Sequence, residues 1–318
     1  MIYFIIAIVL FGLQLFYFRL ADRFNIIDKP NERSSHTRIT LRGGGIIFYP
    51  AVLIFFVTSG FLYPWFWVGL SLISIISFAD DIKPQSSKLR LSIHFVAILL
   101  LFMQWGLFNF PWYYWIFALV LCTGIVNAYN FMDGINGITG AYSMAGIICL
   151  WYINNYVSTF TDNRLIYLTI IALLVFCFFN FRKKARCFAG DVGSVSMAFI
   201  VVFLLGQLII SSGNFSYIML LSVYGVDAVL TIAHRITLRE NIFKPHRKHL
   251  YQLLANELKV PHLIVSGAYA VLQLIISMGL LLSGTHHVIY SLLVITGLCT
   301  TYVCIKKKYF FLHTANRQ

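Results

Sequence analysis

The sequence has little charge and no informative cysteine pattern. Only 11% of its 318 residues are charged, against roughly 25% in a soluble domain, while 59% are hydrophobic. This composition excludes an ordinary cytosolic globule and a disordered chain. The six cysteines show neither the spacing of a zinc or redox motif nor the density of a disulfide-stapled secreted module.

The chain also lacks internal repeats, low-complexity linkers and room for a second domain. A membrane-spanning helix takes about 20 apolar residues, so eleven helices take about 220 and leave about a hundred for loops. We therefore predict a single all-α transmembrane domain over residues 1–318. The first apolar run has no preceding basic residue and no small-residue cleavage site, which indicates a retained helix and not a signal peptide.

Runs without Asp, Glu, Lys or Arg predict the crossings, because a charge in hydrocarbon is costly. Three runs are long enough to cross twice, with turn residues near 60–64, 108–111 and 283–286 between the halves: 43–79, 91–132 and 260–305. Four further runs fit one crossing each: 1–18, 138–156, 165–181 and 194–212. A single crossing also fits 217–235, although this segment carries Asp227. The sum is eleven helices, with the termini on opposite sides.

The basic residues then lie almost entirely on one face. With eleven crossings, 23 of the 24 Lys and Arg residues share that face, and Arg164 is the exception. By the positive-inside rule this face is cytoplasmic, so the N-terminus is outside and the C-terminus inside. Most of the net charge of +13 therefore reports orientation, and it does not indicate nucleic-acid binding.

Nine of the eleven acidic residues lie at or near the cytoplasmic helix ends. They are Asp22, Asp28, Glu32, Asp80, Asp81, Asp133, Asp191, Glu240 and Glu257. A transporter usually carries its ionisable groups near the bilayer midplane. The observed distribution indicates instead a site at the membrane boundary for a polyanion and a divalent metal. Only Asp227 falls near the predicted midplane, where we expect a packing role.

Two segments near the N-terminal half combine charges with glycines or paired carboxylates. The loop from Asp28 to His36 is followed by Arg42 and three glycines, whose N–H groups can approach an anion; a polar hairpin is the alternative. Adjacent Asp80 and Asp81 repel unless they share a cation, and Mg²⁺ prefers such ligands. One of them could instead act as a base, and a solvated helix cap is the commoner role of such a pair alone.

Three later segments carry further polar motifs. Residues 127–137 hold several Asn side chains, which suit recognition of a base or sugar. A basic run, 182–186, leads to Phe188 and to Asp191 within Gly-Asp-Val-Gly-Ser, an acidic metal ligand beside glycines. The third segment interleaves His246 and His249 with cations, which favours phosphate binding over a soft metal.

In order and spacing, these five segments resemble the polyprenyl-phosphate N-acetylhexosamine-1-phosphate transferase family, which includes phospho-N-acetylmuramoyl-pentapeptide translocase. The resemblance spans roughly residues 22–252. It implies an enzyme of the bacterial inner membrane with its active site on the cytoplasmic face. Such an enzyme transfers a sugar 1-phosphate from a UDP-N-acetylaminosugar to undecaprenyl phosphate and releases UMP, with Mg²⁺ or alternatively Mn²⁺ as cofactor. A homodimer is also implied.

The resemblance further implies roles for twelve residues. Asp191 would bind the metal; Asp80, supported by Asp81, would deprotonate or position the lipid phosphate, with Lys88 nearby. The substrate-binding residues would be Gly44, Asn127, Asn130, Asp133, Phe188, His246, Arg247 and His249, with Phe188 stacked on uracil. We expect direct attack of the lipid phosphate on the β-phosphorus and not an aspartyl-phosphate intermediate.

The fifth segment bears on the donor sugar. It reads Pro-His-Arg-Lys-His-Leu-Tyr-Gln, without the three consecutive histidines of the peptidoglycan translocase. This argues against a muramoyl-pentapeptide donor and resembles the branch that starts O-antigen, lipopolysaccharide or other surface polysaccharides with N-acetylfucosamine or N-acetylquinovosamine. UDP-N-acetylglucosamine is the alternative donor. A transporter or lipid-linked flippase and a structural subunit are the alternatives from other classes.

Overall fold

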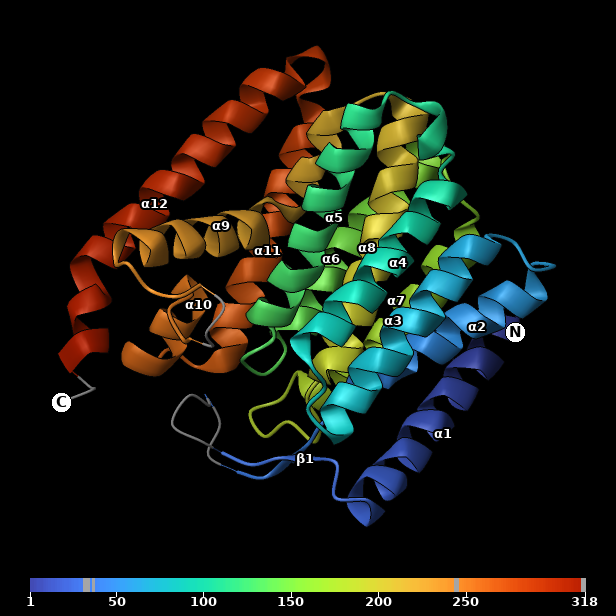
Figure 1. The fold of residues 1–318 in the computed structure, drawn as a ribbon, viewed down its shortest axis with the longest axis horizontal. Coiled ribbons are helices and arrows are strands. Elements are labelled where there is room, and N and C mark those ends of the chain that lie inside the picture. Colours follow the sequence, from blue (N-terminus) through green and yellow to red (C-terminus); the bar gives the residue numbers. More distant parts are fainter. Residues whose placement is uncertain (31–34, 36–37, 243–245, 316–318) are drawn as a thin grey trace.

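The computed structural model describes residues 1–30, 35, 38–242 and 246–315. The expected all-α architecture is confirmed (Figure 1). The longer helices are α1 (Ile2–Arg23), α2 (Phe48–Thr58), α3 (Pro64–Ile82), α4 (Ser87–Gln104), α5 (Trp112–Met132), α6 (Ile138–Tyr156), α7 (Asn163–Asn180), α8 (Gly190–Ser212), α9 (Ser222–Thr237), α11 (His262–Leu282) and α12 (His287–Ala315). A short α10 (Leu250–Gln252) lies between α9 and α11, and strands β1 (Ile27–Asp28) and β2 (Thr40–Leu41) pair antiparallel.

Each predicted crossing corresponds to one long helix, and the three predicted interruptions are present. For example, α2 ends at Thr58 and α3 begins at Pro64, because a proline suits the first turn of a helix. Nine segments of the described residues have the length and composition to cross a membrane. The segment Gly44–Thr58 is shorter, and α6 is not among the nine. The count of eleven crossings and the orientation therefore remain predictions.

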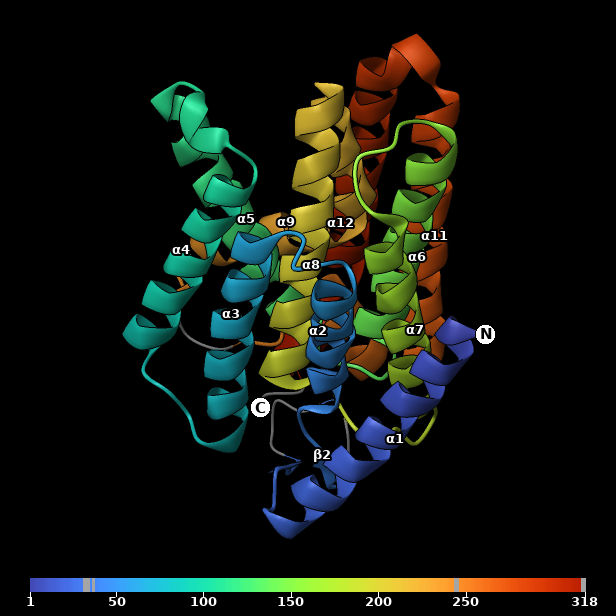
Figure 2. The same cartoon turned by 90° about the vertical axis from the view of Figure 1, so that its right-hand side faces the viewer.

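Helix α8 lies at the centre of the bundle (Figure 2). It packs against α2, α3, α5 and α6, and most of its side chains are buried. A helix that is apolar on every side is stable only when neighbours surround it. The N-terminal end of α8, which carries Asp191, is therefore held by the most enclosed element of the fold.

Helix α9 departs from the direction of the bundle. A 3-10 turn at Phe215–Leu221 precedes it, and Figure 1 shows α9 running across the direction of α5 and α8. Because backbone groups in an apolar medium need partners, side chains of other helices satisfy this break. Gln273 accepts the N–H of Val223 at 3.1 Å and donates to the carbonyl of Met219 at 2.9 Å. Asp227 thus lies on a crosswise helix and not on the upright one that the sequence predicted.

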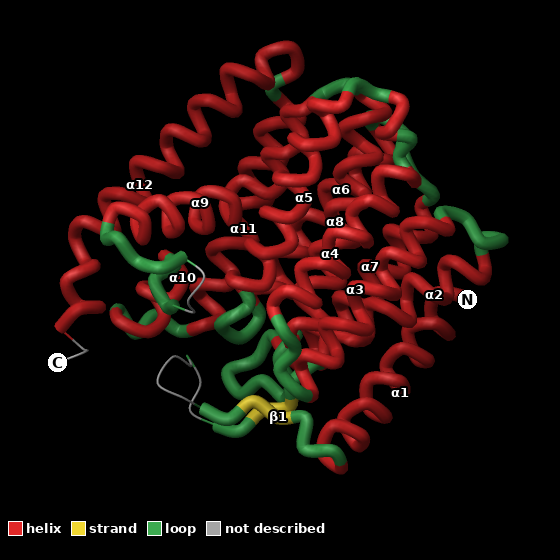
Figure 3. The backbone as a smooth tube through the Cα atoms, viewed as in Figure 1, coloured by secondary structure: helices red, strands yellow, loops and turns green. Residues whose placement is uncertain are grey.

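The polar connections gather at one end of the bundle (Figure 3). The β1–β2 hairpin, the loops after α3, α5 and α7, and the segment around α10 all lie at the lower end in Figures 1 and 3. Hydrogen bonds join segments that are far apart in the chain, such as Asn136 to Arg182 and Tyr251 to Phe131. The described parts of the five motifs therefore lie at one end of the bundle.

Candidate active site

Three carboxylates and two guanidinium groups form a cluster where α3, α4 and α8 meet. We call Asp80, Asp81, Asp191, Arg42 and Arg90 the carboxylate cluster. Arg42 Nε lies 2.7 Å from Asp81 Oδ1, and Arg42 Nη2 lies 3.1 Å from Asp191 Oδ1. Arg90 Nη1 lies 3.0 Å from Asp80 Oδ2 and 3.1 Å from Asp191 Oδ2. The two guanidinium groups thus hold the three acids together, although Arg42 and Asp191 are 149 residues apart in the chain.

Asp81 differs from its neighbour because its side chain has no solvent exposure. Its two oxygens accept the backbone N–H groups of Asp191 at 2.9 Å and Val192 at 3.0 Å. These N–H groups have no partner inside α8, and a carboxylate at a helix N-terminus is favourable. Asp81 therefore caps α8, a helix distant in sequence, and fixes the backbone that presents Asp191.

The three glycines after Arg42 serve close packing. Gly44 N donates to the carbonyl of Phe188 at 2.8 Å, and Gly45 N donates to that of Ala189 at 3.1 Å. A Cβ on Gly45 would lie 2.3 Å from Gly193 Cα, so only glycine allows this approach. The N–H groups of Gly44 and Gly45 thus bind protein carbonyls in this structure, and a role of Gly44 in substrate binding remains a prediction.

Arg90, and not Lys88, is the basic residue of α4 in the cluster. Lys88 is exposed on the first turn of α4, and its side chain forms no hydrogen bond or ion pair with the described residues. Arg90 lies two residues later, and its side chain reaches both Asp80 and Asp191. The role of Lys88 at the lipid phosphate remains a prediction.

The carboxylate oxygens are hard donors of the type that Mg²⁺ prefers. Asp80 and Asp191 each direct one oxygen at the same nitrogen of Arg90, so a cation already bridges them. Across the described ranges, no group of three or more His, Cys, Asp or Glu side chains is arranged to hold a metal. The donor chemistry fits a divalent ion, while the arginines supply the compensating charge in this structure.

The end of α5 adjoins the cluster. Asn130 Oδ1 accepts a hydrogen bond from Ser194 Oγ of α8 at 2.9 Å. Asp133 accepts one from Thr139 Oγ1 at 2.7 Å, and burial raises the pKa of Asp133 to about 7. Asn127 is half-buried one turn before Asn130. Asn130 thus contacts the helix that carries Asp191, while the contacts of Asn130 and Asp133 with a nucleoside remain predictions.

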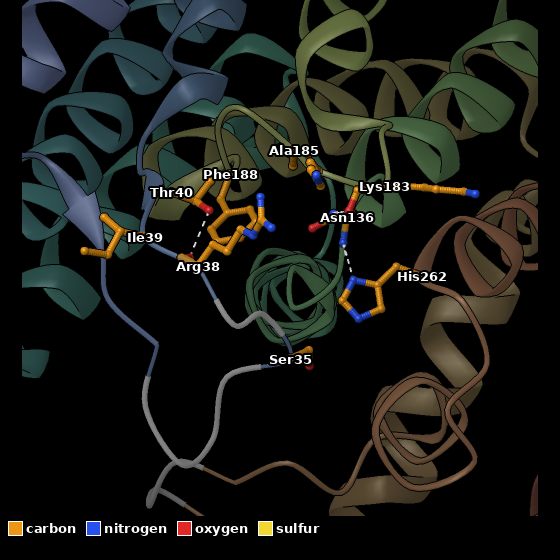
Figure 4. Close-up of a pocket in the computed structure, with 10 residues that line it drawn as sticks. Ser35, Arg38, Ile39, Thr40, Asn136, Lys183, Ala185, Phe188 and His262 are labelled. Atoms are coloured by element: carbon orange, nitrogen blue, oxygen red, sulfur yellow. Dashed lines mark hydrogen bonds between the residues drawn. The ribbon is translucent and has the colours of Figure 1, made fainter.

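A cavity of about 420 Å³ opens between β2, the loop after α7 and the start of α11 (Figure 4), and its lining residue Phe188 precedes Asp191 by three residues. Its wall includes Arg38, Asn136, Lys183, Lys184, Phe188 and His262. Three of these side chains are cationic, and no acid is among the described residues that line it. An aromatic ring and basic groups together suit a ligand with a flat base and phosphates.

Asn136 and His262 were not assigned roles from the sequence. The Asn136 side chain donates to the carbonyls of Arg182 at 2.9 Å and Lys183 at 3.3 Å, and His262 Nδ1 accepts the Asn136 N–H at 3.5 Å. Figure 4 shows Asn136 and His262 facing each other beside the cavity. Asn136 belongs to the amide-rich motif, which could have indicated it. His262 has no comparable signal.

Ion pairs stabilise residues 246–252, which we call the histidine segment. Arg247 lies 3.2 Å from Glu257, Lys248 pairs with Glu240, and Lys306 of α12 donates to the Lys248 carbonyl. Burial, His249 and nearby cations lower the pKa of His246 to about 3, so His246 is neutral at physiological pH. Arg247 is therefore already paired within its own segment, and a phosphate would compete with Glu257 for it.

Comparison with known proteins supports the resemblance. Residues 63–209 match the model of glycosyl transferase family 4. The chain is also similar to a probable undecaprenyl-phosphate N-acetylglucosaminyl 1-phosphate transferase of Bacillus subtilis, with 25% identity over 74% of this chain and 71% of the relative. The match to an undecaprenyl-phosphate alpha-N-acetylglucosaminyl 1-phosphate transferase of Escherichia coli is 23% over 79% and 75%.

These matches confirm the family resemblance predicted from the motifs. A glycosyl transferase family favours an enzyme over the transporter and structural alternatives. The matched region runs from α3 into α8, and thus includes all three acids of the carboxylate cluster together with Asn127, Asn130, Asp133 and Phe188. The histidine segment and Arg42 lie beyond it.

Parts of two predicted motifs fall outside the residues that the structure describes. Glu32 and His36 of the first loop lie there, as do Lys244 and Pro245 before His246. Of the predicted site residues, the structure brings Asp80, Asp81, Asp191 and Asn130 into one network. Phe188 lines the adjoining cavity, and the histidines lie beyond the end of α5.

Proposed function

We propose that this protein transfers an N-acetylaminosugar 1-phosphate from a UDP-sugar to undecaprenyl phosphate and releases UMP. The observation that carries the proposal is the carboxylate cluster beside a cavity with cationic and aromatic walls. The names of the relatives from Bacillus subtilis and Escherichia coli support the same reaction class. We propose that it runs on the cytoplasmic face of the bacterial inner membrane.

In this reaction an oxygen of the lipid phosphate attacks the β-phosphorus of the donor. A bond forms between them, and the bond from the β-phosphorus to the oxygen bridging to the α-phosphate breaks, so that UMP leaves with that oxygen. Such a displacement depends mainly on positioning and charge stabilisation. Both substrates are anionic, and the cations around the site would offset their repulsion.

The residues divide this work by location. Arg38, Lys183 and Lys184 would bind donor phosphates, while Phe188 would stack on the uracil ring. Asp80 would position the lipid phosphate after its ion pair with Arg90 is released. Asp81 would act through α8 and not on the substrate, because both its oxygens are taken by backbone N–H groups.

Magnesium is part of the proposal. Asp191, with Asp80 beside it, would hold the ion, which would neutralise charge on the pyrophosphate. Arg90 lies between these two acids, and its guanidinium group would bind a substrate phosphate there. Mn²⁺ offers the same oxygen-ligand chemistry as the alternative.

The donor sugar is the finer part. We propose UDP-N-acetylfucosamine or UDP-N-acetylquinovosamine, because of the Pro-His-Arg and Tyr-Gln elements around His246 and Gln252. UDP-N-acetylglucosamine is the second candidate, and the names of the two relatives favour it. Either donor would start a surface polysaccharide such as O-antigen or lipopolysaccharide. We also propose a homodimer.

The decisive experiment measures UMP release by purified protein with undecaprenyl phosphate, Mg²⁺ and a panel of UDP-sugars. We expect release only when lipid and donor are both present, and none with EDTA. Trapping a phosphorylated enzyme with donor alone would contradict the direct attack. Failure to release UMP with any UDP-N-acetylaminosugar would reject the proposed function.

A further inference from the structure

The buried carboxylate of Asp227 accepts five hydrogen bonds from the residues around it. Its Oδ1 accepts from Leu250 N at 2.9 Å, Thr231 Oγ1 at 3.2 Å and His249 Nδ1 at 3.3 Å. Its Oδ2 accepts from Tyr269 OH at 2.7 Å and Tyr251 N at 3.2 Å. The carboxylate is 3% exposed, so these donors replace water entirely.

The donors come from three separate parts of the chain. Thr231 belongs to α9, Tyr269 to α11, and the two N–H groups open α10. Tyr302 of α12 adds a further layer, with its hydroxyl 2.9 Å from that of Thr231. Asp227 thus ties the histidine segment to three helices at one point.

The contact with His249 sets the state of its ring. Because Nδ1 faces a carboxylate oxygen, the tautomer with the proton on Nδ1 is favoured, and this tautomer has its lone pair at Nε2. That Nε2 atom is buried and has no hydrogen-bond partner among the described residues. An imidazole held by a carboxylate on one side and bare on the other is poised to accept a proton or hydrogen bond.

His249 lies close to the predicted site. Its ring is 5.0 Å from that of His246 and 6.4 Å from that of Phe131, which is 46% exposed. Phe131 precedes Asp133 by two residues, and Tyr251 donates to the Phe131 carbonyl at 2.9 Å. His249 therefore lies beside the end of α5, next to the segment that carries Asp133.

We propose that Asp227 is a positioning residue for the transfer reaction: it fixes the ring of His249 so that Nε2 can bind a hydroxyl or protonated phosphate oxygen of the substrate. This inference rests on the proposed function and assigns a residue outside its five motifs. Asp227 itself touches no substrate. Its effect would pass through His249 alone.

The test compares Asp227→Asn, His249→Gln and the double variant in the UMP-release assay. Asparagine keeps the shape but turns one acceptor into a donor amid five donors, so we expect kcat to fall about 10- to 100-fold, as for other carboxylates that orient a functional histidine. The KM for the UDP-sugar should change less than about threefold, because donor contacts persist. The double variant should be no worse than the more impaired single variant.

Two tyrosine variants serve as controls. Tyr269→Phe removes one donor to Asp227 and should lower kcat only slightly. Tyr290→Phe removes a comparable hydroxyl bond, from α12 to the Ile276 carbonyl, and should leave kcat unchanged. The proposal would be overturned if the fold-loss of kcat in the double variant equalled the product of the two single losses. A normal kcat for Asp227→Asn would also overturn it.

Chemical labelling separates this proposal from the enzymatic one. We expect diethyl pyrocarbonate to modify His249 slowly in the native protein and several times faster in Asp227→Asn, with exposed His286 as internal standard. If the native protein releases no UMP, the proposed function fails and so does the catalytic part of this inference. Equal labelling of His249 in both proteins would reject the positioning contact itself.

Discussion

The carboxylates of Asp191 and Asp227 lie in the same half of the molecule but have opposite surroundings. Asp191 faces two guanidinium groups and the acid Asp80, with 16% of its side chain exposed. Asp227 faces two backbone N–H groups, two hydroxyls and an imidazole, with 3% exposed. Charged partners can be exchanged for a metal or a phosphate at little cost in structure, whereas converging neutral donors fix one arrangement.

The largest effect should follow from removing the charge of Asp191. We expect Asp191→Asn to lower turnover by about a hundredfold or more, since electrostatic stabilisation dominates such reactions. The variant should remain folded, because its helix is still capped by Asp81. Turnover by the UMP assay and thermal unfolding in detergent check both points. Activity near that of the native protein would remove Asp191 from the site.

The two basic residues of α4 provide a sharper comparison. Arg90→Met leaves Asp80 and Asp191 without their shared cation, so we expect about a tenfold or greater loss of turnover. Lys88→Met should cost less, because the exposed Lys88 does not reach the cluster. Parallel kcat measurements on the two variants test this ranking. A larger loss for Lys88→Met would restore the role that the sequence predicted for it.

The glycine contact can be tested through stability. Gly45→Ala forces a Cβ to 2.3 Å from Gly193 Cα, and overpacking of this kind costs about 1–3 kcal/mol. We expect a lower unfolding temperature and a further loss of activity as α8 shifts. Gly12→Ala, where the added Cβ meets nothing within 4 Å, is the matched control. Equal melting temperatures would show that the contact tolerates a methyl group.

The smallest expected effect concerns pH. Burial raises the pKa of Asp133 to about 7 in the folded protein, from about 4 when unfolded. The folded chain then binds more protons between these values, so stability falls as pH rises from about 4 to about 7. Asp133→Asn should flatten the decline of the unfolding temperature between pH 5 and 8. Asp162→Asn, whose carboxyl has a lowered pKa, should not.

The sequence predicted much of the fold because membrane insertion is decided locally. The three interruptions in long apolar runs were correct, as at Pro64, since turn residues act on their immediate neighbours. It singled out motifs that include Asp80 and Asp191, because these are polar groups that a membrane boundary tolerates only for a reason. It did not predict the direction of α9, the crosswise helix that carries Asp227, because this direction depends on Gln273 from another segment.

By itself, then, the sequence determined that this is an all-α membrane protein with its polar motifs on one face. Only the tertiary structure decided that Asp81 caps α8, that Arg90 bridges two acids, that Gly45 packs on Gly193 and that Asp227 holds His249. The physical reason is that transfer into a membrane is favoured or opposed segment by segment. Hydrogen bonds and ion pairs between distant segments depend instead on how the helices pack.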